Sequence, residues 1–252
     1  MVTRKSRREI EKMRTAGRIV AEVLALVESE LKPGVSTGHL DRIAERHIRA
    51  AGAIPSFKGY GHKSNPFPAS LCISIDDEVV HGIPGDRTIR MGQVVSVDAG
   101  AIYDGWHGDG ARTFVVGPQT PEVEALVEAT RLAMMAGIAS AVPGARIGDI
   151  SAAIEDVAAP RGYGIVRQFV GHGIGTEMHQ EPQVPNYRSG VRGLALAPGI
   201  CLAIEPMLTL GNADVEIKPD GWTVVTSDGS LAAHFEHTIA ITENGPEILT
   251  TI

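Results

Sequence analysis

The chain lacks several features that would assign it to other classes of protein. Only two of its 252 residues are cysteine, Cys72 and Cys201, and both lie in apolar runs. This fits reduced thiols in the cytoplasm better than a disulfide framework. No window approaches the roughly 18 consecutive apolar residues of a membrane span. The basic start of the chain is not followed by the apolar segment of a signal peptide. We therefore expect a cytoplasmic protein with no membrane contact.

An excess of basic residues is also absent. The formal net charge of -7 argues against a general nucleic-acid binder, which is normally basic. The exception is local, because seven basic side chains crowd the first eighteen residues: Arg4, Lys5, Arg7, Arg8, Lys12, Arg14 and Arg18. They are interpreted as a solvated terminus and helix face, or alternatively as a contact for an anionic partner such as the ribosome.

Periodicity predicts two helices followed by strands in the first half of the chain. Apolar residues recur at helical spacing over residues 9–29, and a second helix is expected from Ser36 or Thr37 to Gly52. Residues 53–70 carry the glycine and proline pattern of a loop. Strands are expected at 71–75 and 78–81.

A β-hairpin with two carboxylates is predicted next. The apolar run 94–97 leads to Asp98, the pair Asp104-Gly105 is a two-residue turn signal, and a second strand follows Asp109. This turn places residue 109 opposite residue 100, which shares a sheet face with Asp98. The two carboxylates are then diagonal neighbours, roughly 7–8 Å apart at the backbone. Such a pair needs a partner, which is a pair of arginines, solvent or a metal ion.

The second half of the chain repeats the first. Residues 33–40 are echoed by residues 143–150, and residues 91–98 by residues 198–205. In both copies of the second segment a glycine stands six residues before a carboxylate, Asp98 or Glu205, that ends an apolar strand. We therefore expect one domain, 1–252, made of two similar halves, about 1–117 and 118–252, whose carboxylates converge on a central site.

Further candidate ligands follow in the second half. His172 is flanked by Gly171 and Gly173, which permit close approach of a ligand, although this loop could also be read as a phosphate cradle. A last hairpin is expected from strands 222–226 and 231–241 around Asp228-Gly229, with Glu236 in mid-strand. Two Asp, one His and two Glu suit hard or borderline divalent ions, and four carboxylates are more charge than one dication balances. Two ions sharing a water would balance them.

Six motifs together resemble the type I methionine aminopeptidases, in their short bacterial form. They are residues 78–84, 98–109, 171–175, 179–182, 204–207 and 235–238, and they span nearly the whole chain in order. The resemblance implies an α+β pita-bread fold, in which two pseudo-symmetric halves form a curved antiparallel sheet covered by helices.

The resemblance also implies the site residues and their roles. The metal ligands are Asp98, Asp109, His172, Glu205 and Glu236, with Asp109 and Glu236 bridging two divalent ions (Co, Mn, Fe(II), Zn or Ni). The catalytic residues are His81, His179 and Glu205, of which the two histidines also contact the substrate and Glu205 accepts a proton from the bridging water. The methionine side chain would contact segments that contain Phe57, Tyr60, Phe67, Cys72, Met178 and Trp222.

The implied activity is removal of the initiator methionine from nascent proteins whose second residue is small. We expect the protein to be a monomer. Three alternatives remain: a peptidase of the same fold directed at X-Pro bonds, a non-enzymatic binding protein on that fold, and a phosphate-binding module built on the Gly171 loop. The loop at residues 61–66 looks longer than in the plainest family members, which affects the rim of the methionine pocket.

Overall fold

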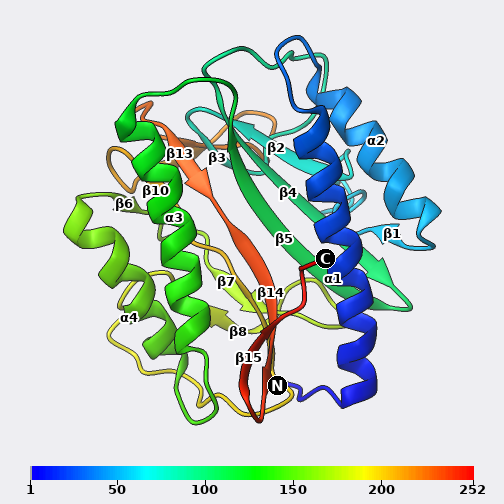
Figure 1. Cartoon of the computed structure of the whole chain (residues 1–252), viewed down its shortest axis with the longest axis vertical. Coiled ribbons are helices and arrows are strands. Elements are labelled where there is room, and N and C mark those ends of the chain that lie inside the picture. Colours follow the sequence, from blue (N-terminus) through cyan, green and yellow to red (C-terminus); the bar gives the residue numbers. More distant parts are fainter. Residues whose placement is uncertain (1) are drawn as a thin grey trace.

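A central antiparallel sheet holds the molecule together, and helices cover one of its faces (Figure 1). The computed structural model describes residues 2–252. Its helices are α1 (Arg7–Glu30), α2 (Thr37–Ala50), α3 (Pro121–Ser140), α4 (Ile147–Ala158) and the 3₁₀ turn η1 (Ala159–Arg161). None of these helices combines the length and apolar character needed to cross a membrane.

Within residues 2–252, nine strands form the central sheet, whose main path runs β1-β4-β5-β14-β9-β7-β8, with β2 paired to β4 and β15 to β14. Their bounds are β1 (Ile54–Pro55), β2 (Leu71–Ile75), β4 (Val94–Tyr103), β5 (Trp106–Val115), β7 (Gly171–Gly173), β8 (Gln180–Val184), β9 (Cys201–Ile204), β14 (Glu236–Thr242) and β15 (Gly245–Ile248). Two small sheets flank it. One contains β13 (Ala232–His234), β10 (Met207–Thr209) and β6 (Gly164–Ile165), and the other β11 (Val215–Ile217), β12 (Val224–Thr226) and β3 (Glu78–Val80).

The long helix α1 fixes which face of the β4–β5 hairpin is free for a site. It begins at a capping box, in which Ser6 and Glu9 each bond the other's backbone N–H. Further along, α1 lies so close to β5 that a Cβ added at Gly108 would come within 2.6 Å of the Gly17 nitrogen. Since Gly108 faces α1, the alternation of a strand turns the neighbouring Asp109 to the opposite face.

The two halves of the chain use the same local devices. Glycines 34 and 144 precede α2 and α4 with φ of 89° and 86°, and glycines 92 and 199 precede β4 and β9 with φ of 86° and 94°. Only glycine adopts such positive φ values without strain. In Figure 1, α1 and α2 lie on one side of the view and α3 and α4 on the other.

Most of the elements expected in the first half are present, but the last hairpin was predicted wrongly. The helix expected at 9–29 is α1, the strand at 71–75 is β2, and the loop at 53–70 contains only the two-residue strand β1. The turn at Asp228-Gly229 exists, yet β12 pairs with β11 and β3 while β13 pairs with β10. Each strand already has partners elsewhere, so the two flanks of this turn do not pair. Glu236 therefore begins β14 instead of lying in mid-strand.

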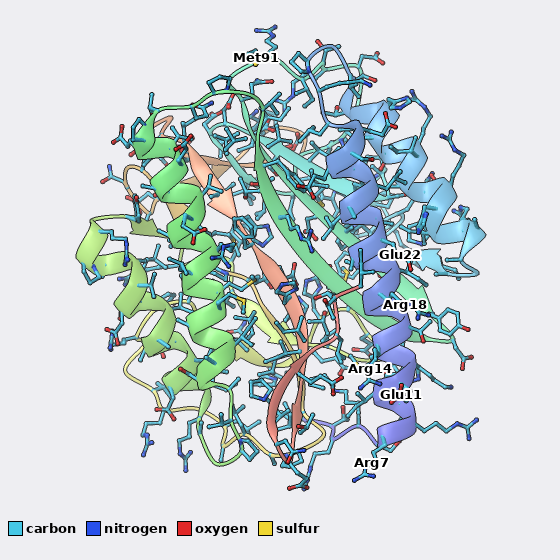
Figure 2. The ribbon with its side chains drawn as sticks, in the orientation of Figure 1. Arg7, Glu11, Arg14, Arg18, Glu22 and Met91 are labelled. Atoms are coloured by element: carbon cyan, nitrogen blue, oxygen red, sulfur yellow. The ribbon has the colours of Figure 1, made fainter. Side chains whose placement is uncertain are left out.

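The basic N-terminal residues are largely paired within the chain. Figure 2 shows Arg7, Glu11, Arg14, Arg18 and Glu22 along α1. Arg14 forms ion pairs with Glu11 and with Glu247, the latter at 2.6 Å, and Lys12 pairs with Asp104 at 2.5 Å. Lys5 is buried. Much of the positive charge in the first eighteen residues is therefore neutralised by ion pairs within the chain.

Candidate metal centre

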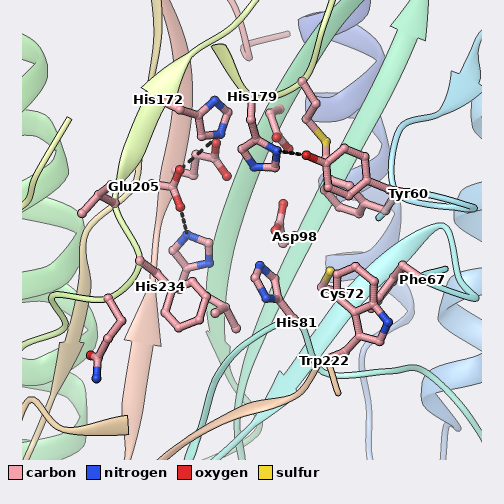
Figure 3. Close-up of a pocket in the computed structure, with 18 residues that line it drawn as sticks. Tyr60, Phe67, Cys72, His81, Asp98, His172, His179, Glu205, Trp222 and His234 are labelled. Atoms are coloured by element: carbon pink, nitrogen blue, oxygen red, sulfur yellow. Dashed lines mark hydrogen bonds and ion pairs between the residues drawn. The ribbon is translucent and has the colours of Figure 1, made fainter. Parts of the chain in front are cut away.

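A pocket of about 250 Å³ opens on the sheet face opposite α1, and every residue predicted for the site lines it (Figure 3). The predicted lining comprises Phe57, Tyr60, Phe67, Cys72, His81, Asp98, Asp109, His172, Met178, His179, Glu205, Trp222 and Glu236. The carboxylates and His172 gather on the sheet, while the apolar residues come mainly from the loops at its rim. The pocket therefore has a charged end and an apolar end.

The register of the β4–β5 hairpin brings its two aspartates together as predicted. Tyr103 is opposite Trp106 and Gly100 is opposite Asp109, so Asp98 and Asp109 share a face at diagonal positions. The turn residue Asp104 has φ 47° and the next residue, Gly105, has φ 80°, as a tight two-residue hairpin turn requires. The turn thus fixes the relative position of the two carboxylates.

Sheet order adds the other three members of the cluster. Glu236 is opposite Ala111 of β5, and β14 in turn pairs with β9, whose last residue, Ile204, precedes Glu205. His172 lies on β7, the next strand beyond β9. Its Nε2 is 3.3 Å from Glu205 Oε1. We call Asp98, Asp109, His172, Glu205 and Glu236 the five-residue cluster.

The cluster has the ligand atoms of a metal site, and several of its carboxylate oxygens lack a hydrogen-bond partner. One ligand atom from each of Asp109, His172 and Glu236 lies within 4.8 Å of the others. Among the described residues, Asp98 Oδ1, Asp109 Oδ1 and Glu236 Oε1 are buried without a hydrogen-bond partner. Buried carboxylate oxygens rarely stay unpartnered, and oxygen with one imidazole suits hard or borderline dications. These residues therefore fit a divalent metal.

Burial raises the pKa of every carboxyl in the cluster, and crowding of negative charge adds to this rise for Asp109, Glu205 and Glu236. Burial raises the pKa of Asp98 to about 7. Burial, followed by the charges of Asp98 and Glu205, raises the pKa of Asp109 well above its ordinary value. Burial likewise raises the pKa values of Glu205 and Glu236, with added repulsion from neighbouring carboxylates. Without a cation the site holds protons, and a bound cation would displace them.

His172 is prepared to act as a neutral ligand. Burial, followed by repulsion from His179, lowers its pKa to about 3. Its Nδ1 lies 3.0 Å from the carbonyl oxygen of Gly173. A hydrogen bond from Nδ1–H to that carbonyl leaves the Nε2 lone pair facing the carboxylates, which is the tautomer that binds a metal.

The apolar end of the pocket is built from aromatic and sulfur-containing side chains. Phe67 and Trp222 meet edge to face with their ring centroids 5.2 Å apart, and Phe57, Cys72 and Met178 belong to the same buried cluster. The rim is fastened by the loop at residues 61–66, because Trp222 Nε1 donates to the Asn65 carbonyl oxygen at 3.1 Å. Such a wall complements a flexible unbranched apolar side chain.

Two further histidines lie between the two ends of the pocket. His81 has φ 59°, an uncommon value for a residue with a side chain, and burial lowers its pKa to about 4. Its ring meets Phe169 edge-on at 5.4 Å. His179 lies 4.2 Å from His172 between ring centroids, and its Nδ1 is 2.5 Å from the Tyr60 hydroxyl. Burial lowers the pKa of His179 as well.

The most important residue that the sequence analysis missed is His234. It lines the pocket, it is buried, and its Nε2 lies 4.0 Å from Glu205 Oε2 without a hydrogen-bond partner. The period of two along a strand could have found it, because residue 234 shares a face with Glu236. Phe169 was missed too, but a lone large apolar residue gives no sequence signal for a pocket.

Comparisons with known proteins agree with this geometry. Residues 11–243 match the model of metallopeptidase family M24. A methionine aminopeptidase from Clostridium acetobutylicum is 51% identical over 251 residues, covering 99% of each chain. The crystal structure of methionine aminopeptidase from Thermotoga maritima has a TM-score of 0.96 and 42% identity, with 100% of both chains covered. These matches confirm the expected pita-bread fold.

A prolidase from Pyrococcus furiosus shares the fold but less of its length. Its structure has a TM-score of 0.79 and 23% identity, and the match covers 99% of this chain but 65% of the prolidase. At this identity the likeness concerns the fold alone.

Proposed function

The chain belongs to metallopeptidase family M24, and we propose that it is a methionine aminopeptidase that removes the initiator methionine from nascent polypeptides whose second residue is small. The observation that carries the proposal is one pocket in which a metal-ligand cluster adjoins an apolar compartment. A methionine side chain in that compartment would hold the first peptide bond beside the cluster. The pocket therefore selects a chain end and not an internal bond.

The five-residue cluster would hold two divalent ions, with Asp109 and Glu236 shared between them. When bound, the ions would supply an activated water and polarise the carbonyl of the peptide bond to be cleaved. Co, Mn, Fe(II), Zn and Ni all remain candidates, because the oxygen-rich donor set does not separate them.

The protein's own groups would handle the proton and the substrate. Glu205 would be the base that takes a proton from the attacking water, since its Oε1 lies 3.3 Å from the ligand His172 within the cluster. His179 donates a hydrogen bond to the oxygen of the reacting carbonyl, where negative charge develops. His81, at the other side of the cleft and against Phe169, contacts the amine side of the substrate.

The compartment for methionine comprises Phe57, Tyr60, Phe67, Cys72, Met178 and Trp222. Tyr60 and Trp222 both line this compartment, and Trp222 is held by its hydrogen bond to the loop at residues 61–66. These side chains would leave little room for a large second side chain. Small second residues are therefore preferred.

The test is hydrolysis of two peptides by chelator-stripped protein, with each candidate ion added back in turn. Met-Ala-Ser should release methionine in a metal-dependent way and Met-Leu-Ser should not. The Asp109→Asn variant is the matched control, because it keeps the side-chain shape but lacks the shared carboxylate, and it should be inactive with every ion. Retained turnover in this variant would contradict the bridging role of Asp109.

Cleavage directed at X-Pro bonds is the second candidate, favoured only by the shared fold. The same assay with an Ala-Pro peptide separates the two activities. Release of alanine without release of methionine would replace the proposed function with this one.

The remaining assignments follow from the proposed substrate. Because nascent polypeptides are made in the cytoplasm, we propose that the enzyme acts there. We also propose that it is a monomer with one domain, whose two halves are residues of about 1–117 and 118–252. Of the basic N-terminal residues, Arg7 and Arg8 form neither an ion pair nor a side-chain hydrogen bond among residues 2–252, whereas Arg4 and Lys5 form side-chain hydrogen bonds. Arg7 and Arg8 therefore remain available for a ribosome contact. Loss of co-sedimentation with ribosomes in Arg7→Glu/Arg8→Glu would support that contact, and unchanged co-sedimentation would refute it.

A further inference from the structure

Tyr60 and His179 form a side-chain hydrogen bond at the mouth of the pocket. The Tyr60 hydroxyl lies 2.5 Å from His179 Nδ1, and the two rings are 5.3 Å apart between centroids at an angle of 52° (Figure 3). The two residues are 119 positions apart in the chain, so this bond joins the loop after β1 to the loop after β7. No other side-chain hydrogen bond of Tyr60 or His179 occurs within residues 2–252.

The backbone of its loop holds Tyr60 in place for this contact. Tyr60 N donates to the Phe57 carbonyl at 2.9 Å, and the Tyr60 carbonyl accepts from Phe67 N at 2.8 Å. Gly59 N donates to the Phe67 carbonyl at 2.8 Å. Because these backbone hydrogen bonds fix the loop, the Tyr60 hydroxyl has a defined position and can orient the ring of His179.

The direction of the bond follows from the acidity of the two groups. A phenol, with a pKa near 10, is a much better donor than a neutral imidazole N–H, and an unprotonated imidazole nitrogen is a much better acceptor than a phenol oxygen. The Tyr60 hydroxyl therefore donates to Nδ1. The proton of the neutral His179 ring must then lie on Nε2.

This tautomer decides what His179 can do next to the five-residue cluster. Its ring lies 4.2 Å from that of His172, close enough that a free nitrogen lone pair could compete for the ions. A protonated Nε2 has no lone pair and can only donate. His172 shows the opposite arrangement, with Nδ1 directed at the Gly173 carbonyl.

We propose that Tyr60 is a positioning residue that locks His179 in its Nε2–H tautomer, which makes His179 a hydrogen-bond donor to the substrate carbonyl and keeps it out of the metal ligand set. This inference rests on the proposed function only for the identity of the acceptor. The lock itself is a property of the two side chains. Tyr60 thus serves the reaction through His179 in addition to lining the methionine compartment.

The direct test is the tautomer of His179, read from ¹⁵N shifts in long-range ¹H–¹⁵N spectra of protein labelled at histidine. The His179 signals are identified by their absence in His179→Gln. We expect Nδ1 unprotonated and Nε2 protonated in the metal-free wild type, and a mixture of both tautomers in Tyr60→Phe. The Tyr163→Phe variant, altered outside the pocket, should leave the spectrum unchanged. An unchanged His179 tautomer in Tyr60→Phe would overturn the proposal.

Kinetics separate positioning from simple pocket lining. Tyr60→Phe keeps the ring that lines the compartment, so kcat should fall about tenfold, as for partners that orient a functional group, with KM within about twofold. The double variant Tyr60→Phe/His179→Ala should be no slower than His179→Ala alone, because the hydroxyl acts only through the histidine. The proposal would be contradicted if the kcat losses of the two single variants multiplied in the double variant. If the wild type releases no methionine, the proposed function fails, whereas the spectra still decide whether the tautomer is locked.

Discussion

Replacing Asp98 by asparagine should stabilise the metal-free protein, although it removes a residue of the five-residue cluster. Burial raises the pKa of Asp98 from its ordinary value of 3.8 to about 7. That difference corresponds to about 4 kcal/mol of unfavourable free energy for the ionised side chain in the fold at pH 8. An asparagine amide has the same shape, carries no charge and can donate to Asp109. We expect about 2–4 kcal/mol of added unfolding free energy, or a Tm higher by about 4–8 °C.

Metal should reverse this order of stability. The wild type gains about 3 kcal/mol at a metal concentration of one hundred times Kd, and Asp98→Asn should gain much less. The assay is calorimetric unfolding at pH 8, with chelator and then with increasing Mn or Co. The two Tm curves should cross as metal is added.

Asp228→Asn is the matched control for charge removal away from the pocket. Hydrogen bonds from Ser230 and Asn212 lower the pKa of Asp228 to about 2, so loss of its charge should lower Tm slightly, with or without metal. The reasoning is refuted if Asp98→Asn has a lower Tm than the wild type in chelator. That result would mean that protein groups, and not a cation, stabilise the Asp98 carboxylate.

Three further outcomes are expected. The carboxyls of the five-residue cluster have raised pKa values, so the folded metal-free protein holds more protons than the unfolded chain. Its unfolding free energy should therefore fall as the pH rises above about 7, where the histidines of the unfolded chain are already neutral. Denaturant titrations from pH 7 to 9 measure this slope, and added metal should remove it. His179→Ala should lower kcat and leave the metal affinity close to that of the wild type by isothermal titration calorimetry, since His179 is a donor and not a ligand. A large loss of affinity would make it a ligand. Glu78→Gln should lower the unfolding free energy by about 2 kcal/mol in urea, because the buried Glu78 accepts hydrogen bonds from Arg87 and Lys218; an unchanged value would show these contacts to be neutral.

The site could be predicted from the sequence where local rules fix geometry. The turn at Asp104-Gly105 and the period of two along a strand are enough to place Asp98 beside Asp109, and the structure has that register. Residues joined only by sheet order, such as His172 and Glu236, could be grouped by resemblance to a family but not by local spacing.

Long-range strand pairing explains what could not be predicted. The turn at Asp228-Gly229 suggested a hairpin, but β3 and β11 occupy both edges of β12. No local pattern in residues 222–241 reveals that β3, more than 140 positions earlier, is the partner. His234 was missed for a different reason. Only Glu236 was considered as a site residue on that face of the expected strand, although residue 234 lies on the same face.

The β4–β5 hairpin also limits how the length of this chain can change. Between Asp98 and Asp109 every residue outside the two-residue turn is paired with one on the opposite strand. One residue added to or removed from either strand would rotate a carboxylate toward α1, where Gly108 and Gly17 leave no room for a side chain. Insertions that preserve activity should therefore be confined to the turn itself, where extra residues project away from the strands. Surface loops such as residues 61–66 face no such constraint, so variation in chain length should accumulate at the rim of the pocket and not at its floor.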